Sequence, residues 1–158
     1  MKVLLAVDGS PCSEAAVNEV ALRPWPTGSQ VKIVTAYELP PPAPTPYAWA
    51  VPAEYFDEME KAAQTSAQAI LDAAADKLAA SLNQSVQVTK EILSGSPRSA
   101  ITEEADRWQA DLIVMGSHGY GAWHRFLLGS VSQAVVSHAK CSVEVVRDRE
   151  TTQHEMAA

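Results

Sequence analysis

Five short apolar segments recur along the chain and are typical of buried β-strands. Most are rich in Val, Ile and Leu, and three are nearly continuous rather than alternating with polar residues. Continuous apolar runs are typical of strands that are covered on both faces, as in a parallel sheet. The predicted strands are Lys2–Val7, Val31–Tyr37, Val86–Ile92, Leu112–Met115 and Ser142–Val146.

Two of the segments between these strands open with a serine followed by a proline, at Ser10-Pro11 and at Ser96-Pro97. A serine that can cap a helix and a proline suited to the first turn together predict a helix start. The first of these helices should end by Arg23, because two prolines follow it closely. A further short helix is predicted from Gly129-Ser130, with inward-facing residues at Val131, Ala134, Val135 and His138.

The longest helix is predicted from near Ala53 and covers about eight turns. Its apolar residues recur at steps of three and four, so they form one stripe that should pack on the sheet. The stripe consists of Phe56, Met59, Ala63, Ala67, Ile70, Ala74, Leu78 and Leu82.

Strands and helices alternate strictly along the chain. This order favours an α/β sandwich with a parallel sheet, right-handed crossovers and helices on both faces. Ligands in such folds bind at the carboxyl ends of the strands, near a topological switch point. The loops that follow the strands are therefore where functional residues are expected.

Residues 38–52 depart from the alternation, because six of these fifteen positions are proline. The composition predicts an extended, polyproline-like connection rather than a domain boundary. The segment follows the second strand and could fold over a ligand. A surface loop with no special role is an equally good interpretation.

Length and charge narrow the function classes. A chain of 158 residues corresponds to one domain, at roughly 100–200 residues per domain. Twelve Lys and Arg residues against nineteen Asp and Glu residues give a net charge of −7. Broad electrostatic binding to nucleic acid or to an anionic membrane surface is therefore not expected.

Cysteine usage and hydropathy indicate a cytoplasmic protein. Cys12 and Cys141 lie far apart and form no CxxC or zinc-like spacing, so neither a disulfide framework nor a metal centre is predicted. The apolar run at the N-terminus is too short for a signal segment. No stretch approaches the roughly 20 apolar residues of a membrane span.

The stretch after the fourth predicted strand carries the clearest chemical signal. Gly116, Gly119, Gly129 and Ser130 form the spacing Gly-x2-Gly-x9-Gly-Ser, and the last pair opens a helix. Glycines let backbone amides approach an anion, and a helix start adds unpaired amides and a positive dipole end. From Leu112 to Val143 the acidic chain holds no Asp or Glu. Together these features favour phosphate binding over simple turn formation.

At these residues the chain resembles the universal stress protein family, and specifically its ATP-binding branch, which carries this glycine signature. The resemblance also includes Val3–Ser10 and Ala110–Gly119, and it covers nearly the whole chain. It implies a Rossmann-like, adenine-nucleotide-binding fold with strand order 3-2-1-4-5. It further implies a domain over residues 1–147, and the polar composition of the end of the chain predicts a flexible tail at 148–158.

The resemblance also implies roles for individual residues. Gly116, Gly119, Gly129 and Ser130 would line the ribose and phosphates, with the amides of Val131 and Ser132. Asp8 would accept from the ribose or hold Mg²⁺ through water. Residues near the base would be Ala6, Val7, Thr35, Ala36 and Met115. His118 and Arg125 are each as readily bystanders as phosphate contacts.

No Ser-His-Asp or Cys-His arrangement presents itself, so no catalytic residue is assigned. The leading hypothesis is a nucleotide-responsive regulator in a stress response that binds ATP, with Mg²⁺, at the carboxyl edge of the sheet. A slow Mg²⁺-dependent ATPase or phosphotransferase that uses the same cleft is one alternative, and a nucleotide-independent interaction module is another.

The last predicted strand, Ser142–Val146, should lie at an edge of the sheet, where it could pair with another chain. The resemblance implies that this strand pairs with its two-fold mate to form a homodimer. The sequence identifies no other protein partner.

Overall fold

A computed structural model describes residues 1–39, 53–82, 85–119 and 128–148. Nine elements alternate along the described residues. The bounds of the five strands lie within two residues of those expected. They are β1 (Lys2–Ala6), α1 (Pro11–Leu22), β2 (Gln30–Tyr37), α2 (Ala53–Ser81), β3 (Gln87–Ser94), α3 (Pro97–Trp108), β4 (Leu112–Gly116), α4 (Ser130–His138) and β5 (Ser142–Val146).

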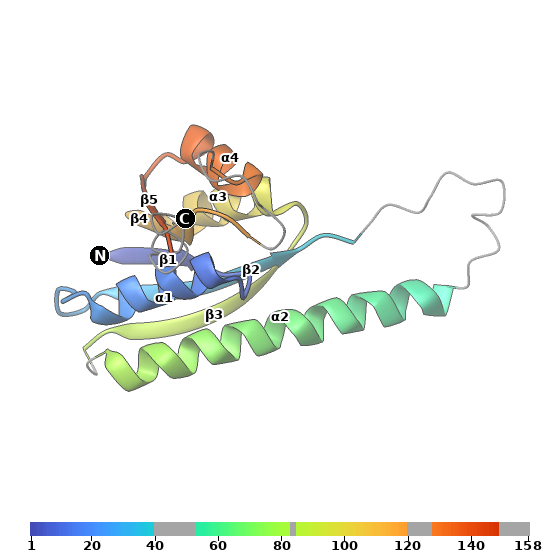
Figure 1. The fold of residues 1–158 in the computed structure, drawn as a ribbon, viewed down its shortest axis with the longest axis horizontal. Coiled ribbons are helices and arrows are strands. Elements are labelled where there is room, and N and C mark those ends of the chain that lie inside the picture. The colour runs from blue at the N-terminus through green and yellow to red at the C-terminus, as the bar shows by residue number, and fades with distance from the viewer. Residues whose placement is uncertain (40–52, 83–84, 120–127, 149–158) are drawn as a thin grey trace, which may run out of the picture.

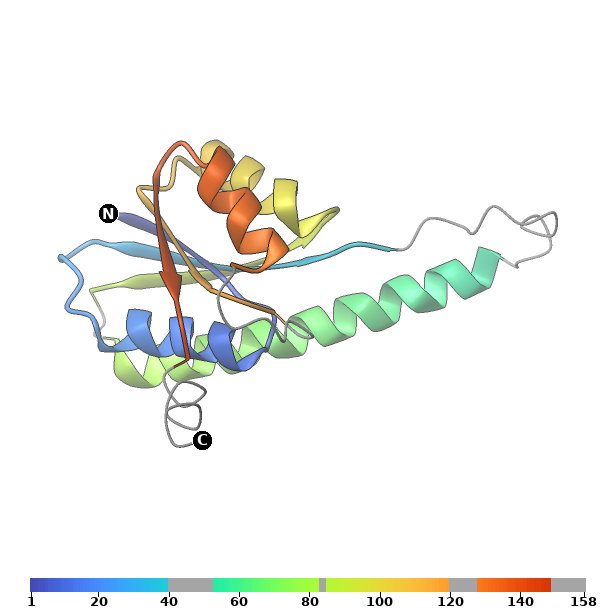
Figure 2. The same cartoon turned by 45° about the horizontal axis from the view of Figure 1, so that its top comes forward.

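The five strands form one parallel sheet in the order β3-β2-β1-β4-β5. This confirms the predicted fold class and strand order. Helices α1 and α2 cover one face of the sheet, and α3 and α4 cover the other (Figures 1 and 2). The chain moves from β1 to β2 on one side and later returns to β4 on the other side of β1. The carboxyl ends of β1 and β4 therefore form the topological switch point.

Alternate side chains of the central strands supply two cores. Val3, Leu5 and Ile33 pack with the buried residues of α1 and α2. Leu4 and Ile113 pack on the other face with residues of α3 and α4. Both faces of β1 and β4 are therefore buried, as their continuous apolar runs predicted.

The short helices begin where their sequences indicated. Ser10 caps α1, and its hydroxyl accepts from the amide of Ser13. Ser96 occupies the capping position of α3 but makes no side-chain capping bond. The inward orientation expected for His138 is wrong, because this side chain is exposed and its Nδ1 lies 2.8 Å from the Ala134 carbonyl oxygen.

Helix α2 extends past the sheet, as Figure 1 shows. Its buried residues begin only at Ala67 and continue through Leu71, Ala74 and Leu78. The stripe residues before Ala67, which are Phe56, Met59 and Ala63, are half-buried rather than covered. Despite the 29-residue length of α2, no helix among the described residues combines the length and apolarity needed to cross a membrane.

A cluster of ion pairs joins β2, β3 and α3. The Lys32 ammonium group donates to Glu104 at 2.7 Å and to Glu91 at 2.8 Å. Arg107 pairs with the same two carboxylates. The ring of Trp108 lies under the Lys32 ammonium, 5.1 Å from it. Glu104 is buried, so these partners are what make its charge tolerable inside the fold.

The cluster shifts the pKa values of Lys32, Glu91 and Arg107 in directions that stabilise the fold. Burial lowers the pKa of Lys32, but the hydrogen bonds to Glu104 and Glu91 outweigh it and raise the pKa above 10.5. Burial raises the pKa of Glu91, but the bonds from Lys32 and Arg107 lower it below 4.5. The Lys32 contribution is therefore lost only as pH rises through its raised pKa. The Glu91 contribution is lost as pH falls through its lowered pKa.

We predict that Glu104→Gln lowers the free energy of unfolding by about 3 kcal/mol, because it removes the buried charge of Glu104 and leaves the half-buried Lys32 with one carboxylate in place of two. Asp106→Asn is the matched control, because Asp106 lies on the same helix as Glu104 but forms an exposed ion pair, with Lys140. Its loss should cost less than about 1 kcal/mol. Urea unfolding at neutral pH measures both values. Equal losses would contradict the assignment.

Candidate functional site

A cavity of about 510 Å³ opens at the switch point, at the carboxyl ends of β1, β2 and β4. Its volume lies within the roughly 300–1,000 Å³ of small-molecule sites. The lining residues come from these strand ends and from the starts of α1, α3 and α4. They are Ala6, Val7, Asp8, Ser13, Val34, Ala36, Pro97, Ile101, Met115, Gly116, His118, Gly119, Gly129, Ser130, Val131 and Ser132.

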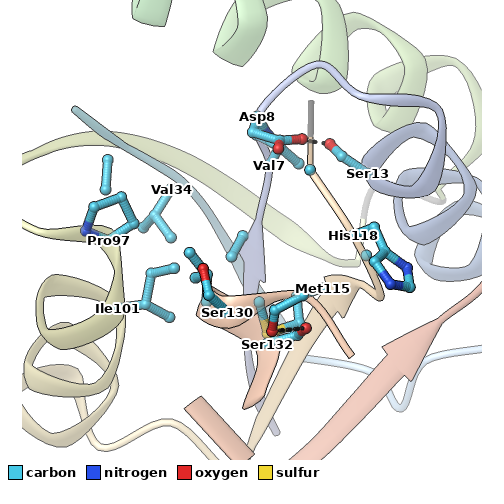
Figure 3. Close-up of a pocket in the computed structure, with 16 residues that line it drawn as sticks. Val7, Asp8, Ser13, Val34, Pro97, Ile101, Met115, His118, Ser130 and Ser132 are labelled. Carbon is cyan, nitrogen blue, oxygen red and sulfur yellow. Dashed lines mark hydrogen bonds between the residues drawn. The ribbon is translucent and has the colours of Figure 1, made fainter. Parts of the chain in front are cut away.

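The cavity has an apolar part and a polar part. Figure 3 shows Val34, Pro97 and Ile101 together on one side, with Asp8 and Ser13 on another. The start of α4 contributes hydroxyl groups and backbone amides to the polar part. Such a cavity suits a ligand that joins a flat apolar group to an anionic group.

The Asp8 side chain is held by the residues that follow it. Gly9 has a φ of 80°, a left-handed conformation that glycine adopts readily, and it turns the chain so that Ser10 faces back toward Asp8. The amide and hydroxyl of Ser10 donate to Asp8 Oδ1 at 3.0 and 2.6 Å. The amide of Asp8 donates to Ser13 Oγ at 3.1 Å. The carboxylate is therefore fixed to the start of α1.

The N-terminus of α4 is open to the cavity. Its capping residue, Gly129, makes no side-chain capping bond. In an α-helix the first-turn amides, here those of Ser130, Val131 and Ser132, have no preceding carbonyl of the helix to bond to. These amides and the positive end of the helix dipole favour an anion at this point.

The backbone of Ser117 holds the start of α4 in position. The Ser117 carbonyl oxygen accepts from the Gly129 amide at 2.9 Å, and Ser132 Oγ lies 2.9 Å from the same oxygen. The Ser117 amide donates to the Val146 carbonyl at 2.7 Å. The end of β4 is thus tied both to α4 and to the end of β5.

Each glycine of the motif allows a close approach. A Cβ on Gly116 would lie 2.7 Å from the backbone carbon of Cys12, at the start of α1. A Cβ on Gly119 would lie 2.5 Å from Asp8 Oδ2. A Cβ on Gly129 would lie 3.1 Å from the Ser117 carbonyl oxygen. The three glycines therefore let β4, α1 and α4 meet around the cavity.

Twelve of the thirteen residues expected at a nucleotide site line this cavity. The exception is Thr35, which is buried between Val34 and Ala36 on β2. Because strand side chains alternate, Thr35 points to the face opposite these two lining residues. The structure therefore favours Ala36 where the sequence left Thr35 and Ala36 open.

Four lining residues were not expected from the sequence: Ser13, Val34, Pro97 and Ile101. Pro97 and Ile101 lie four positions apart and so share one face of α3. Both residues lie in the first two turns of α3. Because each helix of this fold starts at the carboxyl edge of the sheet, this position could have identified them as lining residues.

His118 lines the cavity, but Figure 3 shows its ring turned away from Val34, Pro97 and Ile101. Its Nδ1 lies 3.2 Å from Ser117 Oγ. Arg125 lies outside the described residues, as do the proline-rich positions 40–52 and the tail from residue 149.

Asp8 is the one carboxylate among the described lining residues. No group of three or more His, Cys, Asp or Glu residues in the described part of the chain could hold a metal ion. Both cysteines are free thiols. Burial is the main cause that raises the pKa of Cys141, so its thiol is disfavoured as a nucleophile.

We predict that Gly116→Ala destabilises the fold more than Gly119→Ala does. Gly116→Ala forces apart two backbone segments and should lower the free energy of unfolding by about 2 kcal/mol. Gly119→Ala meets only the end of the Asp8 side chain and should cost clearly less. Urea unfolding compares the two. A larger loss for Gly119→Ala would contradict these packing roles.

Comparisons with known proteins agree with this fold. A family model described as the universal stress protein family matches residues 1–147. A universal stress protein of Thermus aquaticus is 34% identical over 92% of this chain and 97% of its own length. A Mycolicibacterium smegmatis universal stress protein is 33% identical over 94% of this chain, which spans 46% of that relative.

Solved structures give the same result. The hypothetical protein MJ0577 superposes with a TM-score of 0.76 at 23% identity, over 92% of this chain and 94% of that one. A universal stress protein crystallised in complex with cAMP superposes with a TM-score of 0.64 at 30% identity, over 92% and 96% of the two chains. With a family model that matches nearly its full length, the chain belongs to the universal stress protein family.

Proposed function

We propose that the chain binds an adenine nucleotide in the cavity at the switch point and acts as a nucleotide-responsive regulator. The observation that carries the proposal is the N-terminus of α4. Among the described residues it has no side-chain cap, and it lines the same cavity as the apolar residues of α3. An anion subsite and an apolar subsite within one cavity of about 510 Å³ suit a nucleotide. The 30% identical relative crystallised with cAMP supports this choice of ligand.

The proposed binding mode follows from the two parts of the cavity. The phosphate would accept from the first-turn amides of Ser130, Val131 and Ser132. The base would pack among the apolar residues, where Ala36 and Met115 join those contributed by α3. The ribose would lie near Asp8, whose Oδ2 is turned toward Gly119 and away from the Ser10 contact.

More specifically, we propose that the bound nucleotide is ATP, together with Mg²⁺. The complete Gly-x2-Gly-x9-Gly-Ser spacing supports ATP, because its glycines would let further backbone amides approach the additional phosphates. Asp8 is the residue that would hold Mg²⁺, through water. A carboxylate oxygen is a donor that Mg²⁺ prefers, and Mg²⁺ usually keeps several of its waters. The ion would supply charge neutralisation for the phosphates.

The described residues favour a regulatory role for the bound nucleotide over its hydrolysis or phosphate transfer. Asp8 is the one carboxylate among them that lines the cavity, and two bonds from Ser10 already occupy its Oδ1. A nucleotide that binds one arrangement of the surrounding loops more tightly shifts their populations toward that arrangement. The bound nucleotide would act in this way.

We predict that Ser130→Asp weakens AMP binding at least about tenfold, because the new carboxylate would repel the phosphate. It should not lower thermal stability, since an acidic group is favourable in a first helical turn. Adenosine, which has no phosphate, should lose much less affinity. Isothermal titration calorimetry measures both ligands.

Gln133→Asp is the matched control, because it adds the same charge to an exposed position of α4 that does not line the cavity. It should leave AMP affinity within about twofold of the wild type. Equal effects of the two substitutions would contradict the phosphate assignment. Failure of the wild-type protein to bind AMP, cAMP and ATP would contradict the proposed function itself.

We also propose that the chain forms a homodimer through β5. The sheet has two edges, β3 and β5. The β3 edge carries Lys90, whose exposed charge is of the kind that discourages strand pairing. Both edge charges are paired within the chain: Lys90 with Asp72 of α2, and Glu144, the charged residue of β5, with Arg23 of α1 at 2.7 and 2.8 Å. The other residues of β5 are one serine and three valines, and this short, mostly apolar edge supports pairing with a second copy.

We predict that Val145→Pro converts the dimer to a monomer. The Val146 carbonyl points toward β4, so the alternation of the strand directs the Val145 amide outward, where proline would remove a donor at the edge. Val136→Ser is the control, since Val136 is exposed on α4. Light scattering should give twice the chain mass for the wild type and for this control. A monomeric wild type would contradict the proposal.

A further inference from the structure

We propose that Ser10 is a positioning residue of the site, whose hydroxyl couples the Asp8 carboxylate to the segment 117–119 after β4. The inference rests on the proposed function, because the groups that it positions are those proposed to meet the nucleotide. Ser10 does not line the cavity and is 1% exposed. It therefore acts on a ligand only through the residues that it holds.

Three elements meet at the Ser10 hydroxyl. Its oxygen lies 2.6 Å from Asp8 Oδ1 and 3.2 Å from the His118 carbonyl oxygen. It also accepts from the Ser13 amide at 3.3 Å, which is the helix-capping contact. The capping contact is the longest of the three and the contact with Asp8 is the shortest. The hydroxyl therefore serves the Asp8 carboxylate more strongly than it serves the helix.

A hydroxyl group has one proton, but here two acceptors lie within its reach. The shorter distance assigns that proton to Asp8 in this structure. A ligand group that donates to the Asp8 carboxylate would weaken the hold of Asp8 on the Ser10 proton. The proton would then be available to the His118 carbonyl, and that bond would tie segment 117–119 to the start of α1.

The position of Gly119 makes this coupling consequential. Residue 119 passes so close to Asp8 that a Cβ there would lie 2.5 Å from Oδ2. The carboxylate thus touches segment 117–119 with one oxygen and Ser10 with the other. A change in the hydrogen bonds of Asp8 therefore reaches segment 117–119 by two routes, directly at Gly119 and through Ser10 at the His118 carbonyl. Because coupling between two sites is reciprocal, an ordered segment would in turn favour ligand binding at Asp8.

The coupling is tested by a double-substitution cycle measured by calorimetry with AMP. Ser10→Ala should weaken AMP binding about tenfold, in keeping with the loss of a hydrogen bond to a charged group. Ser10→Thr keeps the hydroxyl and should restore affinity to within about threefold of the wild type. If Ser10 acts through Asp8, adding Ser10→Ala to Asp8→Asn should weaken binding no further than Asp8→Asn alone.

Two further variants separate this role from a structural one. Ser10→Gly also removes the hydroxyl but is tolerated at a helix cap, so it should weaken AMP binding as Ser10→Ala does while costing less thermal stability. Ser29→Ala removes another buried serine hydroxyl, one that donates to the Pro26 carbonyl at 2.7 Å at the opposite end of the sheet. It should leave AMP affinity unchanged.

The outcomes distinguish this inference from the proposed function. If the wild type binds AMP and both Ser10→Ala and Ser10→Gly bind it equally well, the coupling is wrong and the proposed function stands. Multiplicative losses for Ser10→Ala and Asp8→Asn would also overturn the coupling. A wild type that binds no adenine nucleotide would overturn the proposed function, and the inference with it.

Discussion

The architecture of the site depends on the close approach of the end of β4 to the first turn of α1. At Gly116 the two backbones come so near that a Cβ would lie 2.7 Å from the Cys12 carbonyl carbon. This contact fixes α1 beside the switch point, and His118 and Gly119, just after β4, line the cavity. The parallel sheet supplies the strand ends, and this contact sets the distance between the end of β4 and the start of α1 beside the cavity.

The two helix N-termini at this edge are used in different ways. The N-terminus of α1 is occupied by the chain itself, through the Ser10 cap and the Asp8 carboxylate that Ser10 holds. The N-terminus of α4 has a glycine in the capping position and no side-chain cap. One positive helix end is therefore already paired with a carboxylate, and the other is open to the cavity. This asymmetry favours an anionic group near α4 and a hydrogen-bond donor near Asp8.

Sequence patterns predicted the elements well because strand and helix periodicities are local properties. Ser10-Pro11 and the apolar run at Leu112–Met115 identified their elements directly. The glycine spacing identified Gly116, Gly119, Gly129 and Ser130 in the cavity lining, and the family resemblance supplied most of the other expected residues. Contacts between distant segments were not predictable in this way. The buried pairing of Lys32 with Glu104 joins residues 72 positions apart, and no spacing rule relates them.

The covered length of the α2 stripe and the choice between Thr35 and Ala36 could not be predicted from the pattern, since burial depends on where the sheet ends and on which face a strand residue takes. The periodicity of α2 continues past the sheet, so the pattern alone overestimated its covered length. The choice between Thr35 and Ala36 needed the strand register, which the structure supplies.

The central claim is that the open end of α4 binds the phosphate of an adenine nucleotide, and backbone NMR tests it most directly. A titration of isotope-labelled protein with AMP should produce the largest amide shifts at Ser130, Val131 and Ser132, with smaller shifts at Gly116 and Gly119. Adenosine should move the amides near the apolar pocket and spare those of α4. Saturable AMP shifts confined to another surface, or none at all, would contradict the account.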